Sequence, residues 1–302
     1  MEVSPIVSVC MITYNHERFI AQAIEGVLMQ KTEFPIELII GDDFSTDRTR
    51  EICIDYQKKF PEIIKLRLPP KNLGVMPNFI QNLQACKGKY IGICEGDDFW
   101  TDPFKLQKQV DFLEANPDFS LCFTDATVVN EFGVCIGKKL TSRYKRNLTQ
   151  TDILSSTTPP TLTVLFREKV FSSMIPKDLK LVLNGDTFLF SLLTYNGDAA
   201  YMDYCSAAYR VHNGGVWSMI DKEKKLRNSI RTFTHYLESS PVKNKKALIR
   251  NINSLYRDYV NLSIENKNNK LKMELLRQCT VFNLKYKNFY FLTLLKVIFR
   301  NV

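Results

Sequence analysis

The chain has 302 residues and a formal net charge of +9; 45% of its residues are hydrophobic and 24% are charged, values typical of a globular protein. It contains no run of eighteen uncharged apolar residues and no signal-peptide pattern, which argues against a membrane-spanning or secreted protein, so we expect a cytoplasmic one. Its eight cysteines include no CxxC pair, which argues against a disulfide framework or a zinc site.

The first hundred residues alternate between strand-like and helix-like patterns. Apolar, β-preferring runs predict strands, and apolar residues at helical spacing between them predict helices. The predicted strands span residues 7–14, 36–40, 63–68 and 90–94, and the predicted helices span 17–30, 45–60 and 78–87. Strands that alternate with helices of this length imply βαβ units and a mainly parallel sheet.

The alternation breaks after residue 115. Asp102-Pro103 begins a helix that runs to about residue 115, and residues 120–130 form a predicted strand. The Phe132-Gly133 turn predicts a hairpin and therefore an antiparallel element. Residues 138–160 are polar, carry a basic patch and predict a mobile loop. Further segments are predicted as a strand at 161–166, a helix at 185–193, an extended run at 199–212 and helices from 220 onward with a linker at 266–269.

Two acidic pairs follow predicted strands. Asp42-Asp43 ends one, and Glu95-Gly96-Asp97-Asp98 ends another. Neighbouring carboxylates repel one another and are costly to desolvate, so their placement at strand ends favours a site for a hard cation. Because ligands of open α/β sheets bind outside the carboxyl ends of the strands, both pairs indicate one crevice. The alternative is that Asp97 and Asp98 only begin a loop.

Five sequence blocks, in this order, resemble the nucleotide-sugar-dependent glycosyltransferases of family 2. They read VSVCMITYNHERFIAQAIEGVLMQ, IELIIGDDFSTDRT, NLG with KGKYIGICEGDDFWTDP, GDTFLFSLLTYNG and YRVHNGGVWS, and they cover about residues 5–217. The resemblance implies an α/β protein with the GT-A fold, which is Rossmann-like with a mainly parallel sheet flanked by helices. It implies a catalytic domain at 1–218, with a nucleotide-sugar-binding half at 1–100 and an acceptor half at 101–218. A basic helical extension at 219–302 would follow.

The resemblance also implies roles for individual residues near the sugar donor. Asp98 and His212 would bind Mn²⁺ or Mg²⁺, which would offset charge on a leaving nucleoside diphosphate. The first acid of the motif is Glu95 where relatives have Asp, and Met76-Pro77 stands where many carry Arg, so that donor contact differs here. Asp97 would face the ribose or the metal. The residues implied to bind the donor are Thr13, Tyr14, Asn15, Glu17, Asp43, Asn78 and Asp97.

Asp186 falls where the family has its catalytic base. It would take a proton from the acceptor hydroxyl in an inverting reaction, and an ordinary helix cap is the alternative role. Trp100 and Trp217 flank the motifs; each could stack on an acceptor sugar or seal the core beneath it. Acceptor choice is expected to rest on residues 138–160 and the C-terminal helices.

The positive charge belongs to the C-terminal tail. From Lys243 onward thirteen Lys or Arg stand against three Asp or Glu, so this part carries +10 and the first 242 residues carry −1. Residues 270–302 alternate basic with apolar side chains, as does a helix lying in a membrane interface. Peripheral attachment to the inner face of the cell membrane and packing on the catalytic domain or on a homodimer partner both stay open. The chain has no nucleic-acid-binding motif, so nucleic acid is not expected as a partner.

The resulting prediction is a metal-assisted inverting glycosyltransferase. Its donor would be a nucleoside diphosphate sugar, UDP-linked, and its acceptor a glycan or lipid-linked hydroxyl in bacterial surface polysaccharide synthesis. A sugar nucleotidyltransferase is an alternative, although residues 13–18 lack the glycines of its phosphate loop. A catalytically silent sugar-nucleotide-binding or scaffold protein is the other.

Overall fold

A computed structural model describes residues 4–169, 182, 184–215 and 220–288 of the chain. Trp217, predicted to stack on an acceptor sugar or to seal the core, lies outside the described residues. So do residues 289–302, the last part of the segment 270–302 for which a membrane role is predicted. The chain divides into two compact units, Met1–Met219 and Ile220–Val302.

The first unit contains a mixed sheet and its flanking helices. Its strands are β1 (Val7–Thr13), β2 (Ile36–Asp42), β3 (Ile64–Arg67), β4 (Tyr90–Ile93), β5 (Phe99–Trp100), β6 (Phe119–Asn130), β7 (Cys135–Lys138), β8 (Leu165–Arg167) and β9 (Asp198–Val211). Its α-helices are α1 (Ile20–Leu28), α2 (Thr49–Lys59), α3 (Val75–Ala85), α4 (Lys105–Ala115), α5 (Gln150–Ile153) and α7 (Gly185–Asn196). Two 3-10 turns, η1 (Ser142–Tyr144) and η2 (Thr161–Thr163), lie in the connections.

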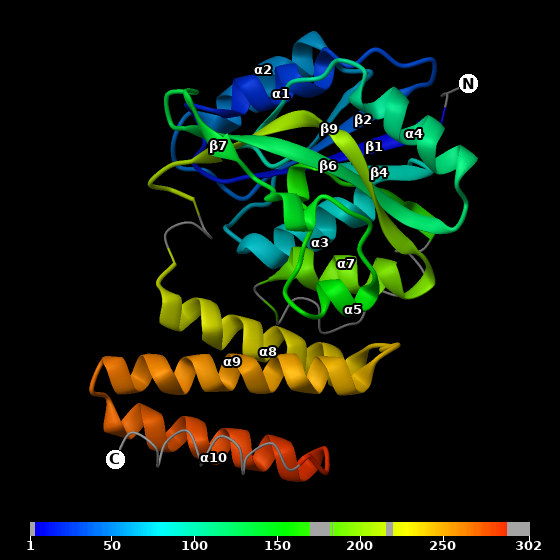
Figure 1. Ribbon diagram of the computed structural model, residues 1–302. Coiled ribbons are helices and arrows are strands. Elements are labelled where there is room, and N and C mark those ends of the chain that lie inside the picture. The colour runs from blue at the N-terminus through cyan, green and yellow to red at the C-terminus, as the bar shows by residue number, and fades with distance from the viewer. Residues whose placement is uncertain (1–3, 170–181, 183, 216–219, 289–302) are drawn as a thin grey trace. The chain divides into compact units, whose positions relative to one another are not determined.

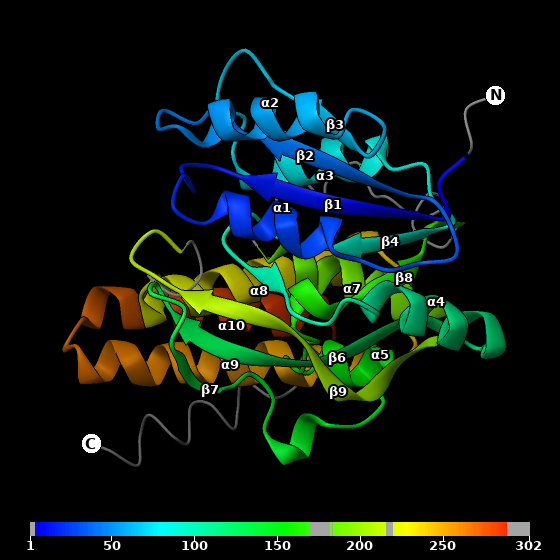
Figure 2. The same ribbon diagram turned by 90° about the horizontal axis from the view of Figure 1, so that it is seen from above.

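Among the described residues the strands form one sheet in the order β3-β2-β1-β4-β8-β6-β9-β5, with β7 paired to β6. β1 is parallel to β2 and to β4, and β6 is parallel to β9. β8 is antiparallel to both β4 and β6, so β6 and β9 run in the same direction as β1, β2 and β4 (Figure 2). The carboxyl ends of these five strands therefore meet at one edge of the sheet, as the two acidic pairs required.

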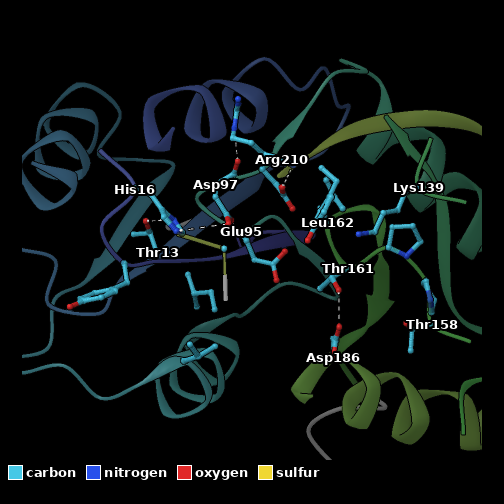
Figure 3. A pocket seen from close by; sticks show the side chains of 18 of the residues that line it. Thr13, His16, Glu95, Asp97, Lys139, Thr158, Thr161, Leu162, Asp186 and Arg210 are labelled. Carbon is cyan, nitrogen blue, oxygen red and sulfur yellow. Dashed lines mark hydrogen bonds and ion pairs between the residues drawn. The ribbon is translucent and has the colours of Figure 1, made fainter. Parts of the chain in front are cut away.

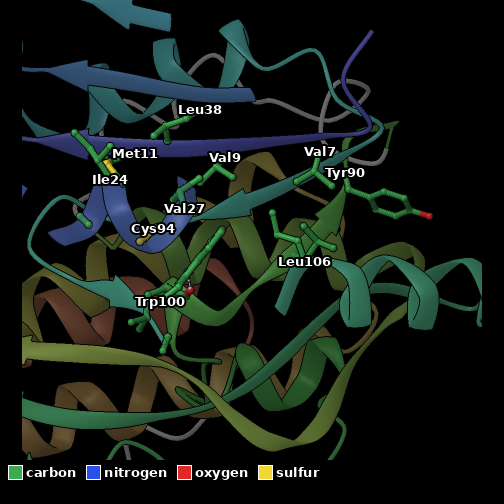
Figure 4. Close-up of a cluster of buried hydrophobic side chains, with 14 of the residues drawn as sticks. Val7, Val9, Met11, Ile24, Val27, Leu38, Tyr90, Cys94, Trp100 and Leu106 are labelled. Carbon is green, nitrogen blue, oxygen red and sulfur yellow. Dashed lines mark hydrogen bonds between the residues drawn. The ribbon is translucent and has the colours of Figure 1, made fainter. Parts of the chain in front are cut away.

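Helices cover both faces of this sheet. α1 and α2 lie on one face, and α3 and α7 lie on the other (Figure 1). α1 buries Ile20, Ile24 and Val27 against β1, because these positions share one face of the helix. Figure 4 shows this core, in which side chains of β1, α1 and β4 meet the ring of Trp100.

Trp100 is a core residue, so the prediction that it stacks on an acceptor sugar is wrong. Its side chain is 1% exposed, and its indole Nε1 donates a hydrogen bond to the carbonyl of Leu162 at 2.8 Å. A Cβ atom at Gly26 would lie 2.9 Å from the backbone nitrogen of Trp100, so only glycine lets α1 approach β5 this closely. The other predicted role, sealing the core, is the one that the structure shows.

Most element boundaries agree with the predicted ones within a few residues. α3 begins at Val75 rather than at residue 78, because Gly74 adopts a positive φ of 86° and turns the chain into the helix earlier. The predicted hairpin is confirmed, with Thr127 of β6 opposite Lys138 of β7. The segment 138–160, predicted as a loop, contains η1 and α5, and Thr149 and Asp152 form a capping box at the start of α5.

The second unit consists of α8 (Lys222–Ser239), α9 (Lys245–Glu265) and α10 (Asn269–Lys285). α9 packs against α8 and against α10. The side-chain oxygens of Asp221, Asn244 and Asn268 each accept a backbone N–H in the first turn of the helix that follows. Between α9 and α10, the buried amides of Asn253 and Asn283 donate to each other, at 3.2 and 2.8 Å.

Among the helices that the structure describes, none has the length and apolar character needed to cross a lipid bilayer.

Candidate active site

A cavity of about 670 Å³ lies at the edge of the sheet where β1, β2, β4 and β9 end (Figure 3). One side, which we call the strand-end wall, is lined by Thr13, Asp43, Glu95, Asp97, Asp98 and Arg210. The other side, which we call the loop wall, is lined by Lys139, Leu140, Tyr144 and residues 156–161. Asp186, in the first turn of α7, faces the same cavity beside Thr161.

Arg210 fixes the acidic loop that follows β4. Its backbone N–H donates to Oδ1 of Asp98 at 2.7 Å, and its guanidinium Nε donates to the carbonyl of Asp97 at 2.9 Å. The same guanidinium reaches Gln22 of α1 at 2.6 Å and lies over the ring of Phe19. Arg210 is 4% exposed, so these bonds are made away from water. Asp98 is consequently held by the backbone of β9.

Asp97 lies between two histidines. Its Oδ2 is 3.0 Å from Nε2 of His212 and 3.9 Å from Nε2 of His16. Each of the three residues offers one ligand atom, and these atoms all lie within 4.8 Å of one another. The structure thus brings Asp97, and not its neighbour Asp98, beside His212. The sequence pointed to Asp98 and His212 as the metal ligands and gave His16 no role.

The protonation of these carboxyl groups follows from their surroundings. Burial, with repulsion by Asp97 and then Asp186, raises the pKa of Glu95 to about 8. Burial and the charges of Asp97 and Glu95 also raise the pKa of Asp98. For Asp97 burial acts upward, but the hydrogen bond with His212 is the first of the opposing causes that together lower its pKa. Asp97 is therefore the carboxyl group of this loop that offers an ionised oxygen at neutral pH.

The donor set fits a divalent cation. Two imidazole nitrogens and one ionised carboxylate oxygen are ligands that Mn²⁺ and related transition-metal ions accept. Burial lowers the pKa of His16, which favours the neutral imidazole that a metal requires. Asp98 fits this role less well, because Oδ1 already accepts the Arg210 N–H.

Four of the predicted donor-binding residues besides Asp97 line the cavity: Thr13, Tyr14, Asp43 and Asn78. The carboxylate of Asp43 accepts backbone N–H groups of Leu73 at 2.7 Å and Gly74 at 2.9 Å, which fixes its orientation. Asn78 is 3% exposed and donates to the carbonyl of Gly41 at 2.8 Å. Tyr14 is 43% exposed, so its ring is open to a ligand.

Asn15 and Glu17, also predicted to bind the donor, are not among the residues that line the cavity. Oδ1 of Asn15 accepts the backbone N–H of Thr46 at 2.8 Å, and Oε2 of Glu17 accepts the backbone N–H of Arg48 at 3.0 Å. Both side chains tie the loop after β1 to the loop after β2. In this structure they shape the site from outside.

The side chain of Asp186 lines the cavity and is held by two hydrogen bonds. Its Oδ1 accepts the backbone N–H of Thr187 at 2.6 Å, and its Oδ2 accepts the hydroxyl of Thr161 at 3.3 Å. The N-cap position of α7 is Asn184, so Asp186 is not the cap residue of its helix. Its carboxylate is held between the start of α7 and the loop wall.

The cavity is also lined by residues for which no individual role was predicted from the sequence. Lys139 places its ammonium group over the ring of Tyr209, and both residues line the cavity. The only sequence signal for Lys139 was its place in a basic patch between residues 138 and 146. Arg210 stood in the quoted YRVH block, but only His212 was taken from that block as a site residue.

The sequence was compared with known protein families. The family described as Glycosyl transferase family 2 matches residues 8–171, more than half of the chain. The chain belongs to glycosyltransferase family 2.

Relatives of the chain include bacterial and archaeal proteins. An uncharacterized protein of Mycobacterium tuberculosis (strain ATCC 25618 / H37Rv) is 36% identical over 210 residues, which is 70% of this chain and 60% of that protein. TuaG of Bacillus subtilis (strain 168), whose name proposes a teichuronic acid biosynthesis glycosyltransferase, is 31% identical over 71% of this chain and 82% of TuaG. This chain thus spans three fifths of the length of its mycobacterial relatives.

Solved glycosyltransferase structures share the fold. S. aureus TarS 1–349 in complex with UDP-GlcNAc superimposes with a TM-score of 0.66, at 16% identity, over 89% of this chain and 79% of that chain. The mannosyltransferase PcManGT from Pyrobaculum calidifontis, in complex with GDP-Man and Mn²⁺, has a TM-score of 0.59 at 12% identity, over 97% of this chain and 86% of that chain. The predicted GT-A fold is confirmed.

Proposed function

We propose that this chain is an inverting glycosyltransferase that moves a sugar from a nucleoside diphosphate sugar to a hydroxyl group of a glycan or lipid-linked acceptor. The observation that carries the proposal is that Asp186 and the Asp97 carboxylate, which is paired with His212 at 3.0 Å, face one cavity at the strand ends. The first can act as a base toward an acceptor, and the second can hold the cation that accompanies a diphosphate. We further propose bacterial surface polysaccharide synthesis as the pathway, which the name of TuaG supports.

The strand-end wall is the proposed donor site. Tyr14 offers an exposed ring, and Asp43 and Asn78 offer fixed polar groups for a base or a ribose. We expect UDP as the nucleotide, in line with the UDP-GlcNAc complex of TarS. The GDP-Man complex of PcManGT makes GDP the alternative to be tested.

Asp97 and His212 are the proposed holders of Mn²⁺ or Mg²⁺. When bound, the cation would offset the negative charge that develops on the diphosphate as the sugar leaves. Asp98, which the sequence favoured as a ligand, would instead keep Asp97 in place through the Arg210 backbone.

Asp186 is the proposed general base. As the acceptor oxygen forms its bond to the anomeric carbon, the bond from that carbon to the diphosphate oxygen breaks, and Asp186 takes the acceptor's proton. Attack from the face opposite the diphosphate inverts the configuration, and one base is sufficient. The Thr161 hydroxyl, bound to Oδ2 at 3.3 Å, would steer the carboxylate toward the acceptor.

The domain roles are proposals on the same basis. Residues 1–218 would be the catalytic domain; 1–100 supplies most of the strand-end wall, and 101–218 supplies the loop wall, Arg210 and the His212 ring that contacts Asp97. Residues 219–302 would be the basic extension, and attachment to the membrane surface or homodimerisation through 270–302 stays a proposal. A truncation after Asn269 that binds anionic liposomes as strongly as the full chain would rule out the membrane role.

The test is calorimetric titration of the full chain with UDP, GDP and dTDP, each with Mn²⁺ and with EDTA. We expect one nucleotide to bind with Mn²⁺, and Asp97→Asn to weaken that binding at least about 10-fold. Asp111→Asn, on the exposed face of α4, is the matched control and should bind as the wild type does.

Two outcomes would favour the alternatives. If a nucleotide binds but no donor sugar is ever transferred or hydrolysed, the chain is a silent binding or scaffold protein. If UTP and a sugar 1-phosphate yield pyrophosphate, it is a nucleotidyltransferase. Failure of every nucleotide to bind would remove the proposal.

A further inference from the structure

The two histidines beside Asp97 come from separate loops. His16 lies in the connection between β1 and α1, Asp97 follows β4, and His212 follows β9. The two imidazole rings are edge to face, with centroids 5.8 Å apart and an interplanar angle of 85°. Side chains of three different segments thus place nitrogen and oxygen atoms within 4.8 Å of one another. Figure 3 shows two of them, His16 and Asp97.

The position of His16 is fixed from two directions. Its backbone N–H donates to the hydroxyl of Thr49 at 2.8 Å. Its ring Nδ1 is 3.2 Å from the hydroxyl of Thr13, a residue that is 3% exposed. When Nδ1 carries the ring proton and donates it to Thr13, Nε2 presents a lone pair toward Asp97. Metal-binding histidines are commonly oriented in this way by a partner on their second nitrogen.

We propose that His16 is a third protein ligand, so that His16, Asp97 and His212 together bind a divalent transition-metal ion before any nucleotide is present. The metal site is argued from the geometry of these three residues. Only its biological use rests on the proposed function, in which the cation would bind the diphosphate of the donor. Its two consequences are binding of the metal by the nucleotide-free protein and a preference for Mn²⁺ or Co²⁺ over Mg²⁺.

The distances are compatible with three ligands on one ion. Ligand atoms bound at about 2.1 Å in octahedral geometry lie about 3 to 4 Å from one another. The Asp97–His212 separation of 3.0 Å and the Asp97–His16 separation of 3.9 Å are already in this range. The two histidine nitrogens, which lie within 4.8 Å of each other, would have to be no more than about 4.2 Å apart in the metal complex. An octahedral ion held by three protein atoms keeps three positions for water or phosphate oxygens.

The ligand types decide which metal is preferred. Mg²⁺ is bound by oxygen atoms and is usually held by one or two carboxylates with phosphates and water. Two imidazole nitrogens favour transition-metal ions instead, and each added nitrogen widens the difference. A site made of Asp97 and His212 alone would therefore prefer transition-metal ions over Mg²⁺ less strongly than a site that also contains His16.

Metal binding would end two existing hydrogen bonds of His212. In the structure Nδ1 of His212 accepts the backbone N–H of Gly214 at 3.2 Å, so Nε2 carries the ring proton toward Asp97. A cation at Nε2 would require that proton to move to Nδ1, which ends both the bond to Asp97 and the bond from Gly214. The net change is one metal bound at Nε2 and the proton moved to Nδ1.

The first measurement is a titration of the nucleotide-free full chain with Mn²⁺, in which the electron paramagnetic resonance signal reports the concentration of free Mn²⁺. We expect saturable binding to one site, weakened at least about 10-fold in His16→Asn and in His212→Asn. His235→Asn removes the one histidine outside the cluster and should bind Mn²⁺ as the wild type does. Mg²⁺ should compete poorly with Mn²⁺ in the wild type and better in His16→Asn.

A second variant separates ligation from folding. His16→Cys replaces one transition-metal ligand by another, so its Co²⁺ complex should gain a thiolate-to-cobalt charge-transfer band that the wild type lacks. The band requires a folded site and direct contact between residue 16 and the metal. Its absence, or equal Mn²⁺ affinities of the wild type and His16→Asn, would overturn the inference and leave His16 as a loop-anchoring residue.

The same samples distinguish this inference from the proposed function. If the wild type binds Mn²⁺ alone but no nucleotide, the metal site stands and the transferase proposal fails. If it binds a nucleotide with Mn²⁺ but no Mn²⁺ alone, the transferase proposal stands and the role of His16 is refuted.

Discussion

The two walls of the cavity are held in different ways. In the strand-end wall the functional groups themselves are fixed: Asp43 accepts two backbone N–H groups, and Asp98 accepts the backbone N–H of Arg210. In the loop wall the bonds that fix the chain lie at its end. Leu162, which lines the cavity, and the adjoining Thr163 offer their carbonyls to Trp100 and Gln109 at 2.8 and 2.9 Å, next to the cavity-lining residues 156–161.

This difference indicates that the two walls bind different ligands. Groups that are fixed by backbone bonds suit a ligand part that never changes, such as a nucleoside diphosphate with its cation. A wall built from a loop with anchored ends can change its lining residues without changing the sheet, which suits an acceptor that differs between family members. Each of the following experiments tests one side of this comparison.

The largest effect is expected where the two walls meet. Asp186→Asn keeps the shape of the side chain but removes the base, so kcat should fall about 10²- to 10⁴-fold while the dissociation constant of the nucleotide stays unchanged. Asp111→Asn on α4 is the control and should keep full activity. Steady-state kinetics and calorimetry on both variants check this, and a fall of less than a few-fold would show that another group accepts the proton.

Breaking the strand-end wall should cost stability and donor binding together. Arg210→Met leaves the carbonyl of Asp97 and the side chain of Gln22 without their donor, which should lower the free energy of unfolding by about 2–3 kcal/mol. Arg231→Met on the exposed side of α8 is the control and should change it by less than about 0.5 kcal/mol. Urea unfolding and nucleotide titration measure both effects; normal nucleotide binding in Arg210→Met would contradict the fixed-wall model.

The anchor of the loop wall contains a buried lysine whose charge can be measured. Lys105 is 0% exposed and bonds Gln109, and desolvation lowers its pKa from 10.5 to about 8. Between pH 8 and 10.5 the unfolded chain therefore binds more protons at this residue, so its contribution to stability rises with pH. The free energy of unfolding of the wild type relative to Lys105→Met should increase by about 3 kcal/mol over that range. A difference independent of pH would show that Lys105 is not desolvated.

Loosening the same anchor at Trp100 should have a smaller effect. Trp100→Phe keeps an aromatic ring in the core but loses the hydrogen bond to the Leu162 carbonyl, so we expect a loss of about 1–2 kcal/mol in stability. The KM for the acceptor should rise because residues 161–163 lose an anchor, while nucleotide affinity should not change. If nucleotide affinity falls as much as acceptor affinity, the walls are not independent.

The smallest effect is expected at the cavity surface of the loop wall. Lys139→Gln removes an ammonium group that reaches the cavity from a loop, so the KM for the acceptor should change less than about 10-fold, and kcat should change little. Lys138→Gln is the neighbouring control and should behave as the wild type, because Lys138 does not line the cavity. A large loss of nucleotide affinity in Lys139→Gln would place this lysine at the diphosphate.

The sequence predicted the sheet, the strand-end crevice and the family because these depend on periodic patterns and ordered motifs. It favoured Asp98 over Asp97 as the metal ligand, but a loop after a strand has no fixed side-chain period from which the two orientations could be derived. The orientation of Asp98 depends on the backbone N–H of Arg210, which comes from a strand more than one hundred residues later. The role of Trp100 depended likewise on Leu162, and those of Asn15 and Glu17 depended on the neighbouring loop.

The reciprocal amide pair of Asn253 and Asn283 fixes the alignment of α10 along α9, and this has a consequence for truncated forms of the chain. A slip of α10 along α9 by one turn would move the two amides about 5.4 Å apart and leave both buried without each other. The two helices thus have one alignment, and removal of α10 would leave the Asn253 amide without its partner. The helix content of a chain shortened between Glu265 and Asn283, such as the truncation after Asn269, should therefore be checked by circular dichroism before that chain is compared with the full one.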